Sequence, residues 1–445
     1  MLSRLAATAR ISYLYCSLYG AFWDAVSCCD REELSMSDDP IFTPEMKDTH
    51  TILVPNMLPI HFRLLISIFT SYGYHMELLE TDSRTVVDEG LKNVHNDTCY
   101  PALLVIGQFM EALKSGRYDP HKTALLLTQT GGGCRASNYI HLLRKCLAVS
   151  FPYVPVISLN FSGLERSQES GWKLTMPMII KCLYGVLYGD MLMSVYNQCR
   201  ANELVKGSSE KILMKWQRKL EHLFQKNRFT ASKRVYREIL DDFAGVERSA
   251  VPKIKVGIVG EIFVKYSPLA NNHLEDFLLS EGCEPVIPPL LEFVLYWAVN
   301  KVNEAEMYGR KNASTCVFRE VYRFLYHKQR EVIRVMNEHG VFAPPHDFEH
   351  LRSSVSRFIG QGVAMGEGWL IPAEMGALAE SGIENIICTQ PFGCLPNHIV
   401  AKGMSRAIKS YYPNANMIAI DYDSGAARVN QENRIKLMLA NAKKF

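Results

Sequence analysis

The stretch TILVPNMLPIHFRLLISIFTSYGYHMELLE, from Thr51 to Glu80, holds the pattern on which the fold depends. A short apolar run is followed by a segment with apolar residues at helical spacing, and a second short apolar run comes next. Short apolar strands that alternate with helices are typical of right-handed βαβ units, in which the strands form a parallel sheet. The stretch therefore predicts an α/β domain with a buried parallel sheet.

The same alternation extends along much of the chain. It continues to residue 162, and a second series opens at KIKVGIVGEIFV, Lys253 to Val264, which suggests an internal duplication at the level of the fold. We expect an α/β fold with two Rossmann-like parallel-sheet domains, helical insertions and a cleft between the domains. The expected units are an N-terminal extension of unknown role (1–48), the first Rossmann-like domain (49–162), a helical insertion (163–250) and the second Rossmann-like domain (251–445), with a helical insertion at about 290–365.

The composition is that of an ordinary globular protein. Of 445 residues, 48% are hydrophobic and 21% are charged, and the net charge is only +3. So small a charge gives no reason to expect nucleic acid or an acidic partner. One basic helical stretch, Lys211 to Phe243, has acidic residues between its lysines and arginines, so we interpret it as a solvated helix face rather than a nucleic-acid patch.

The sequence contains no run of the roughly 20 uninterrupted apolar residues that a membrane span requires. The first 30 residues look like a poor signal peptide, but polar residues and Gly20 interrupt their apolar region, and no Ala-x-Ala cleavage site is evident. We expect a cytoplasmic protein without a membrane span. The N-terminal residues are then a helix docked on the first domain or the remainder of a longer reading frame.

The twelve cysteines fall into two groups. Four of them, Cys99, Cys134, Cys388 and Cys394, lie in loops that contain glycine or proline. Their spacing is not that of a small disulfide scaffold, so the contrast with the other eight argues for a reducing compartment and for metal or redox chemistry at a few positions. The other eight lie in helical or apolar contexts, where a thiol is usually a small core residue: Cys16, Cys28, Cys29, Cys146, Cys182, Cys199, Cys283 and Cys316.

The four loop cysteines are expected at the carboxyl ends of strands or one short loop beyond them. Ligands gather at these ends in doubly wound sheets, and loops of two domains can face each other across a cleft. Iron–sulfur clusters are held by cysteine thiolates on such loops. Zinc is the main alternative metal, although structural zinc usually takes ligands from close pairs and no Cys-x-x-Cys is present. The glycines before Cys134 also suggest a phosphate loop, but the Gly-x-x-x-x-Gly-Lys-Ser/Thr pattern is absent.

Polar residues follow the expected strand at Lys253 and leave several roles open. We interpret Asn272 as a helix cap, whereas Glu261 and Lys265 are equally consistent with a turn and with the lining of the cleft. A hydrolase with a cysteine nucleophile is a weaker hypothesis, because the proline between Cys394 and His398 prevents a regular helical turn that would pair them. His398 is more simply a helix-start residue or a donor to a cluster sulfur.

Six motifs together resemble a known family. NDTCYPALLVIGQ, QTGGGCRASNYI, KVGIVGEIFVKYSPLANN, GEGW, QPFGCLPNHI and IDYDSGAARVNQENRIKLML look like the C-terminal portion of the large acyl-CoA dehydratase activase-related proteins. That group is similar to the 2-hydroxyacyl-CoA dehydratase subunits and to the double-cubane-cluster proteins. The resemblance runs from about Ile52 to Leu439 and leaves residues 1–48 unexplained.

The resemblance implies an oxygen-sensitive iron–sulfur protein of the anaerobic bacterial cytoplasm. In the dehydratase subunits three cysteines hold a [4Fe–4S] cluster and leave one iron open. Carried over, this implies Cys99, Cys134 and Cys394 as ligands, with Cys388 as a spare or a fourth, and a double-cubane cluster as the alternative cofactor. The family's ATPase module has no counterpart in the chain, so electrons would come from a separate ATP-dependent activator that carries its own cluster.

Two functions follow from these expectations. The first is a low-potential reductase or a 2-hydroxyacyl-CoA dehydratase-like lyase component, with a CoA ester as substrate and a homo- or hetero-oligomeric assembly. The second is a non-catalytic cluster carrier or scaffold subunit of a larger complex. Within the last loop, Gly393 and Pro396 favour Cys394 as the ligand, whereas Cys388 directly follows apolar strand residues and is expected to point into packing.

Overall fold

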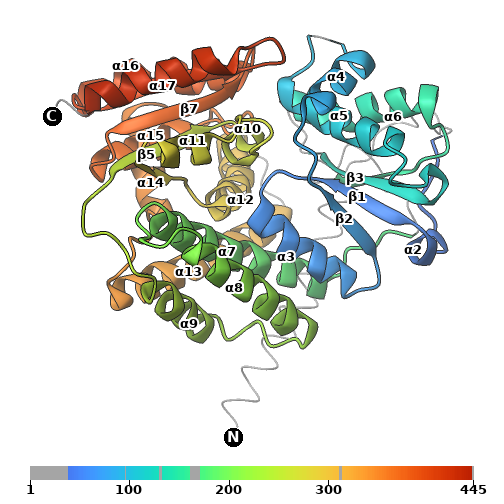
Figure 1. Ribbon diagram of the computed structural model, residues 1–445, viewed down its shortest axis with the longest axis horizontal. Coiled ribbons are helices and arrows are strands. Elements are labelled where there is room, and N and C mark those ends of the chain that lie inside the picture. Colours follow the sequence, from blue (N-terminus) through green and yellow to red (C-terminus); the bar gives the residue numbers. More distant parts are fainter. Residues whose placement is uncertain (1–38, 96, 130–132, 161–170, 310–312, 443–445) are drawn as a thin grey trace, which may run out of the picture.

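The computed structural model describes residues 39–95, 97–129, 133–160, 171–309 and 313–442. It contains two four-stranded sheets, and every strand pair in both sheets is parallel. This confirms the α/β class with two Rossmann-like parallel-sheet domains. The first sheet lies on the right in Figure 1 and the second at the upper left. The N-terminal segment that looks like a signal peptide, with Cys16, Cys28 and Cys29, lies outside the described residues.

The first sheet has the strand order β2-β1-β3-β4. Strand β1 is central and nearly fully buried, and its Leu53 lies opposite Glu77 on one side and Leu125 on the other. Proline opens both α3 and α5, where its fixed φ suits the first helical turn. The elements are α2 (Met46–Thr49), β1 (Thr51–Pro55), α3 (Pro59–Thr70), β2 (His75–Leu79), α4 (Arg84–Asn93), α5 (Tyr100–Lys114), β3 (Thr123–Gln129), α6 (Tyr139–Ser150) and β4 (Val156–Asn160), with 3-10 turns at Pro120–Lys122 and Arg135–Asn138.

The second sheet repeats this order as β6-β5-β7-β8. The repetition agrees with the duplication suggested by the sequence. The central strand β7 carries Ile387 between Ile258 and Ile418 of its neighbours. The elements are β5 (Ile254–Gly260), α10 (Ile262–Tyr266), α11 (Leu274–Ser280), β6 (Cys283–Val286), α15 (Leu370–Glu380), β7 (Asn385–Pro391), a π-helical turn (Asn397–Lys402), α16 (Ser405–Tyr411), β8 (Asn416–Tyr422) and α17 (Arg428–Ala442).

Long helices form a third layer, at the lower left in Figure 1. Helix α7 is long and apolar enough to cross a membrane by length and composition, yet 67% of its most apolar window is buried inside the protein. It packs on α3 of the first domain and on α8, α9 and α12, as a core helix does. The layer consists of α7 (Met176–Arg200), α8 (Ser208–Gln225), α9 (Ser232–Ala244), α12 (Leu290–Met307), α13 (Ala313–His339) and α14 (Phe348–Ser354), followed by a 3-10 turn at Val355–Arg357.

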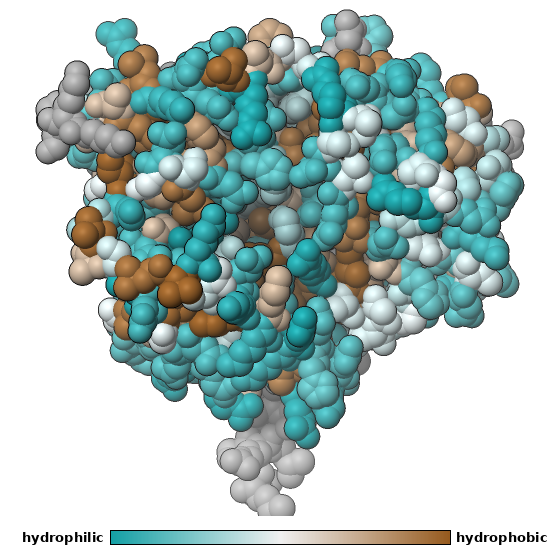
Figure 2. Space-filling view, in the orientation of Figure 1, coloured by the Kyte–Doolittle hydropathy of each residue, from teal (hydrophilic) through white to brown (hydrophobic). Residues whose placement is uncertain are grey.

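One continuous apolar core joins the first domain, the helical layer and the second domain. Leu104 of α5, Leu187 of α7 and Leu295 of α12 belong to the same buried cluster. Burial of this kind contributes most of the stability of a fold. The surface is mixed, and on the face drawn in Figure 2 hydrophilic side chains predominate, with apolar ones in small groups between them.

The loops at the carboxyl ends of the two sheets contact each other. Ser267, in the loop after α10, donates to the carbonyl of Asn56, which follows β1 (3.3 Å). Arg84 of α4 donates to the carbonyl of Ser424, which follows β8 (3.2 Å), and His273 pairs with Asp82 (3.0 Å). These contacts bring the ends where both sheets place their ligand-binding loops to one region of the molecule.

Candidate functional site

Cys99 lies at the start of α5 rather than directly after a strand. Helix α4 separates β2 from the Cys99 loop, and the sequence pattern had not indicated that helix. Cys99 occupies the N-cap position of α5, followed by Tyr100 and Pro101, and its side chain is half-buried. Its place is therefore set by the packing of α5 on α4 and on the sheet.

Cys134 follows β3 and begins the 3-10 turn at Arg135–Asn138. The carbonyl of Cys134 accepts a hydrogen bond from the Ser137 hydroxyl (2.7 Å), which holds the turn closed. A Cβ atom at Gly133 would lie 2.6 Å from the Cε of Met365, so this loop of the first domain packs against a loop of the second. The phosphate-loop interpretation rests mainly on Gly131 and Gly132, which are outside the described residues.

Cys394 lies in the loop that follows β7. Gly393 has φ of +71°, a left-handed conformation that glycine adopts readily, and the amide of Cys394 donates to the carbonyl of Pro391 (3.1 Å). The carbonyl of Cys394 then accepts from the amide of His398 (3.0 Å), at the start of the π-helical turn. The half-buried thiol is thus held between a tight turn and a helix start.

The thiols of Cys134 and Cys394 act electrostatically on the thiol of Cys99. Loss of solvent raises the pKa of the Cys99 thiol first, Glu261 raises it further, and the other two thiols add to the shift. Burial raises the pKa of Cys134 to about 11 and that of Cys394 to about 12. Without a cation, all three thiols are therefore neutral at physiological pH.

Each of the three sulfurs has a hydrogen-bond donor. The side-chain amide of Asn397 donates to the sulfur of Cys394 (3.3 Å). The Tyr139 hydroxyl donates to the sulfur of Cys99, and the backbone amide of Ala136 donates to that of Cys134. Donors of this kind stabilise thiolates and tune the groups that thiolates bind.

Two carboxyl groups stand beside these thiols, and both are held by the first turn of α10. Glu261 is its N-cap residue and accepts from the amide of Val264 (2.7 Å), while Glu367 accepts from the amide of Ile262 (3.0 Å). Asn397 also hydrogen-bonds to the Glu367 carboxyl. Desolvation and the neighbouring Glu367 raise the pKa of Glu261 to about 8, so the pair retains a proton at neutral pH.

Lys265 and Glu374 form a buried ion pair behind this pair of carboxyls. The Lys265 ammonium lies 3.0 and 3.3 Å from the two carboxylate oxygens of Glu374. The exposed fractions of the two side chains are 4% and 1%. Lys265 therefore lies in the protein interior behind the site, and its positive charge is neutralised by Glu374.

Cys388 is placed differently from the other three loop cysteines. It lies within β7, opposite Val259 and Ala419, and is 3% exposed in an apolar cluster with Ile386 and Val400. Burial raises the pKa of its thiol, and Glu374 adds to the shift. The side chain thus belongs to the packing of the second sheet, as its position after apolar strand residues suggested.

One capping prediction was wrong. His273, not Asn272, holds the N-cap position of α11, and the side-chain oxygen of Asn271 accepts from the amide of Leu274, the first residue of the helix (3.1 Å). Asn272 has φ of +56° and donates instead to the side-chain oxygen of Gln431 (2.8 Å). His398 takes its place at a helix start, with its ring 3.8 Å from Asp421 rather than among the sulfurs' donors.

Several groups around the thiols were not singled out by the sequence analysis. Tyr139 and Asn397 gave no signal beyond lying in the two cysteine motifs, and Glu367 was present only as part of GEGW. The role of Glu261 was left open between a turn and the lining of the cleft, and its place directly after a strand is the signal that could have decided it. Such donors and carboxyls become recognisable only when loops far apart in the sequence meet.

Within the described ranges, no group of three or more histidine, cysteine, aspartate or glutamate side chains is placed to hold a single metal ion. Cluster ligands bind different irons and therefore lie farther apart than the ligands of one ion, so this finding concerns mononuclear sites. Comparisons with models of protein families, with curated proteins and with solved structures found no match for the chain.

Proposed function

We propose that this protein holds an iron–sulfur cluster on Cys99, Cys134 and Cys394 and acts as a low-potential reductase or 2-hydroxyacyl-CoA dehydratase-like component. The observation that carries the proposal is that three half-buried thiols from loops of both domains lie close enough for those of Cys134 and Cys394 to raise the pKa of the Cys99 thiol. A [4Fe–4S] cluster on three thiolates keeps one iron without a protein ligand. A separate ATP-dependent activator is the proposed electron donor.

The donor set fits such a cluster. Each thiol is half-buried, and each has a hydrogen-bond donor from Tyr139, Ala136 or Asn397. The side-chain oxygen of Asn397 is buried and has no hydrogen-bond partner, which leaves a polar atom beside Cys394 for a bound group. The raised thiol pKa values are consistent with a cation-dependent site, because a metal cation reverses the local preference for the neutral thiol.

When bound, the cluster would supply low-potential electron transfer and a Lewis-acidic iron for an oxygen atom of the substrate. The chain itself supplies a proton. Glu261, with its pKa near 8, is largely protonated at neutral pH, and Glu367 shares the first turn of α10 with it. Because a hydroxyl group leaves as water only when a proton is added, we assign Glu261 as the proton donor of the proposed dehydration.

A cluster carrier is the second candidate, and one further observation agrees with it. The apolar side chains of Phe392, Leu395 and Ile399, on either side of Cys394, are 68%, 59% and 51% exposed. Exposed apolar groups beside a redox site suit contact with another protein. An activator would need the same surface, so this observation does not separate the two functions.

The deciding experiment uses anaerobically purified full-length protein. Iron and sulfide are quantified, and electron paramagnetic resonance spectra of the reduced protein are recorded with and without a 2-hydroxyacyl-CoA ester. The dehydratase-like function predicts a cluster whose spectrum changes on addition of the ester. It also predicts that the Glu261→Gln variant lacks the proton donor of the dehydration. A cluster that ignores the ester would favour the carrier, and absence of iron and sulfide would refute both.

A further inference from the structure

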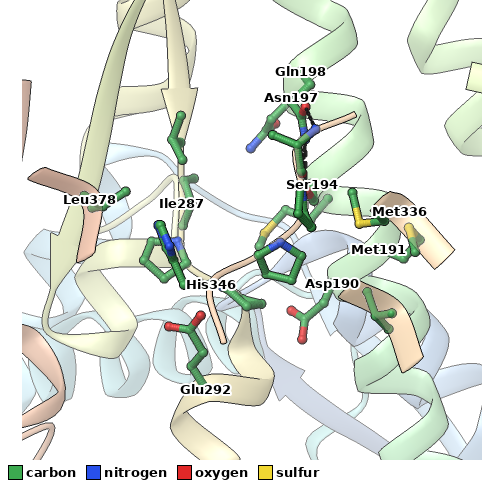
Figure 3. A pocket seen from close by; sticks show the side chains of 18 of the residues that line it. Asp190, Met191, Ser194, Asn197, Gln198, Ile287, Glu292, Met336, His346 and Leu378 are labelled. Atoms are coloured by element: carbon green, nitrogen blue, oxygen red, sulfur yellow. Dashed lines mark hydrogen bonds between the residues drawn. The ribbon is translucent and has the colours of Figure 1, made fainter. Parts of the chain in front are cut away.

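A second candidate site lies apart from the cysteine loops, inside the helical layer. A partly open cavity of about 250 Å³ is lined by α7, by the segment between β6 and α12, and by the stretch at Ala343–His346 (Figure 3). Its walls are mainly apolar and include Met191, Met336 and Ile287. A mostly apolar cavity with a few converging polar groups is the usual form of a small-molecule site.

Glu292 is the polar group in this cavity whose bonding is incomplete. It lies in the first turn of α12, is 1% exposed and lines the cavity, yet its Oε1 atom has no hydrogen-bond partner. Asp190 faces the cavity from α7 (Figure 3). Both of its carboxylate oxygens have hydrogen-bond partners. Asp190 accepts from the amides of Leu290 (2.7 Å) and Leu291 (2.9 Å) and pairs with His61 (2.8 Å).

The charged groups around Glu292 indicate which kind of partner its carboxyl lacks. Burial raises the pKa of Glu292 well above its usual range, with Glu374 as the next cause, so the carboxyl is neutral in the absence of a ligand. Of the basic side chains in this region, Lys265 is bound by both oxygens of Glu374, and the His61 ring is hydrogen-bonded to Asp190. Lys255, which also lines the cavity, pairs with Glu284 (3.7 Å). An unpaired buried carboxyl among acidic neighbours is best satisfied by a cation from outside the chain.

We propose that this cavity binds a small organic monocation, a primary amine with a short apolar body, whose ammonium group pairs with Glu292. The methionine and aliphatic walls favour the alkyl part, and the volume admits on the order of ten non-hydrogen atoms. An anion would add a negative charge beside Asp190 and Glu374, and a neutral alcohol would leave the carboxyl without its ion pair. The lining of the cavity includes none of the four loop cysteines, and the proposal does not rest on the function proposed for them.

The test compares three ligands of the same length on the anaerobically purified full-length protein, by isothermal titration calorimetry. We expect hexylamine to bind at least about tenfold more tightly than hexan-1-ol, and hexanoate to bind most weakly. Glu292→Gln should weaken hexylamine about tenfold while changing the affinity for hexan-1-ol by less than about threefold. The matched control is Glu320→Gln on the exposed face of α13, which should change neither affinity.

A filling substitution provides a second line of evidence. Ser194 lines the cavity from α7, and Ser194→Leu should weaken the amine and the alcohol together, because it removes volume and not charge. Equal affinities for the amine and the alcohol, no binding of any of the three ligands, or unchanged amine binding in Glu292→Gln would each overturn the proposal. The ligand comparison on the unsubstituted protein decides the matter even where a variant fails to fold.

Discussion

The two α/β domains have the same strand order but contribute different groups to the site where their loops meet. The first domain supplies two thiols, Cys99 and Cys134. The second supplies one thiol, Cys394, together with the carboxyls of Glu261 and Glu367. A repeated topology therefore fixes where ligand-binding loops lie, while the side chains on those loops determine the chemistry of each half.

The difference has a consequence for how the site can be disrupted. Neither domain alone holds the full set of thiols, so the set depends on contacts such as Gly133 against Met365 and Ser267 with Asn56. The carboxyls, by contrast, are fixed within the second domain by the amides of α10. Loss of a thiol and loss of a carboxyl should accordingly produce different defects.

The largest expected effect is loss of iron when a thiol is removed from either domain. Cys99→Ala and Cys394→Ala should both reduce bound iron nearly to background, because a cluster on three thiolates needs all three. Cys388→Ala, a change in the packed core of the second sheet, should leave most of the iron in place. Iron analysis and visible absorbance of anaerobically purified variants are the measurement, and equal loss in the Cys388 and Cys394 variants would indicate ligation by four cysteines.

The stability of the protein should be sensitive to removal of one partner of the buried ion pair between Lys265 and Glu374. Lys265→Met leaves Glu374 buried without its cation and should destabilise the protein by about 3–5 kcal/mol. The double variant Lys265→Met with Glu374→Leu should recover most of that loss, because it removes the unpaired charge. Urea unfolding of the single and double variants tests this, and equal stability of the two would contradict it.

The carboxyl pair of Glu261 and Glu367 should make the stability of the protein depend on pH, with a smaller effect than the loss of the ion pair. The pKa of Glu261 is raised from 4.5 to about 8, so the folded protein binds this proton more tightly than the unfolded chain does. Stability should then fall as the pH rises from about 4.5 to 8, by on the order of 1–2 kcal/mol after allowance for partial exposure of the side chain.

The matched variant for this prediction is Glu261→Gln, which keeps the shape of the side chain and removes its titration. Thermal unfolding between pH 5 and about 8 should show a flatter pH dependence for the variant than for the unsubstituted protein. Parallel curves would show that Glu261 does not hold the proton.

The smallest expected effect distinguishes two neighbouring asparagines of the second domain. Asn271→Ala removes the side-chain acceptor of the first amide of α11 and should cost about 1 kcal/mol, the usual net value of one hydrogen bond. Asn272→Ala removes one side-chain hydrogen bond to Gln431 and should cost less. Chemical denaturation of both variants checks the order, and a larger loss for Asn272 would reverse the assignment.

The α/β class, the alternation of strands and helices, and the cysteine loops as candidates for a site could all be predicted from the sequence alone. These features follow from local patterns, since apolar periodicity and turn residues act over a few neighbouring positions. Helix α4 was not predicted because most of its residues are polar and its buried face is narrow. Its buried residues are Val86, Val87 and Gly90. The buried position of Cys388 in the sheet could also be predicted, because this residue continues an apolar strand.

The groups that surround the thiols, and the carboxyls that lack partners, could be identified only in the folded protein. Glu261 and Glu367 are 106 positions apart in the chain, and they meet because α10 offers amides to both. Glu292 differs from any surface glutamate of an amphipathic helix solely in its burial without a hydrogen-bond partner for Oε1. Desolvation and convergence are properties of the folded chain, because they depend on what distant segments place around a side chain.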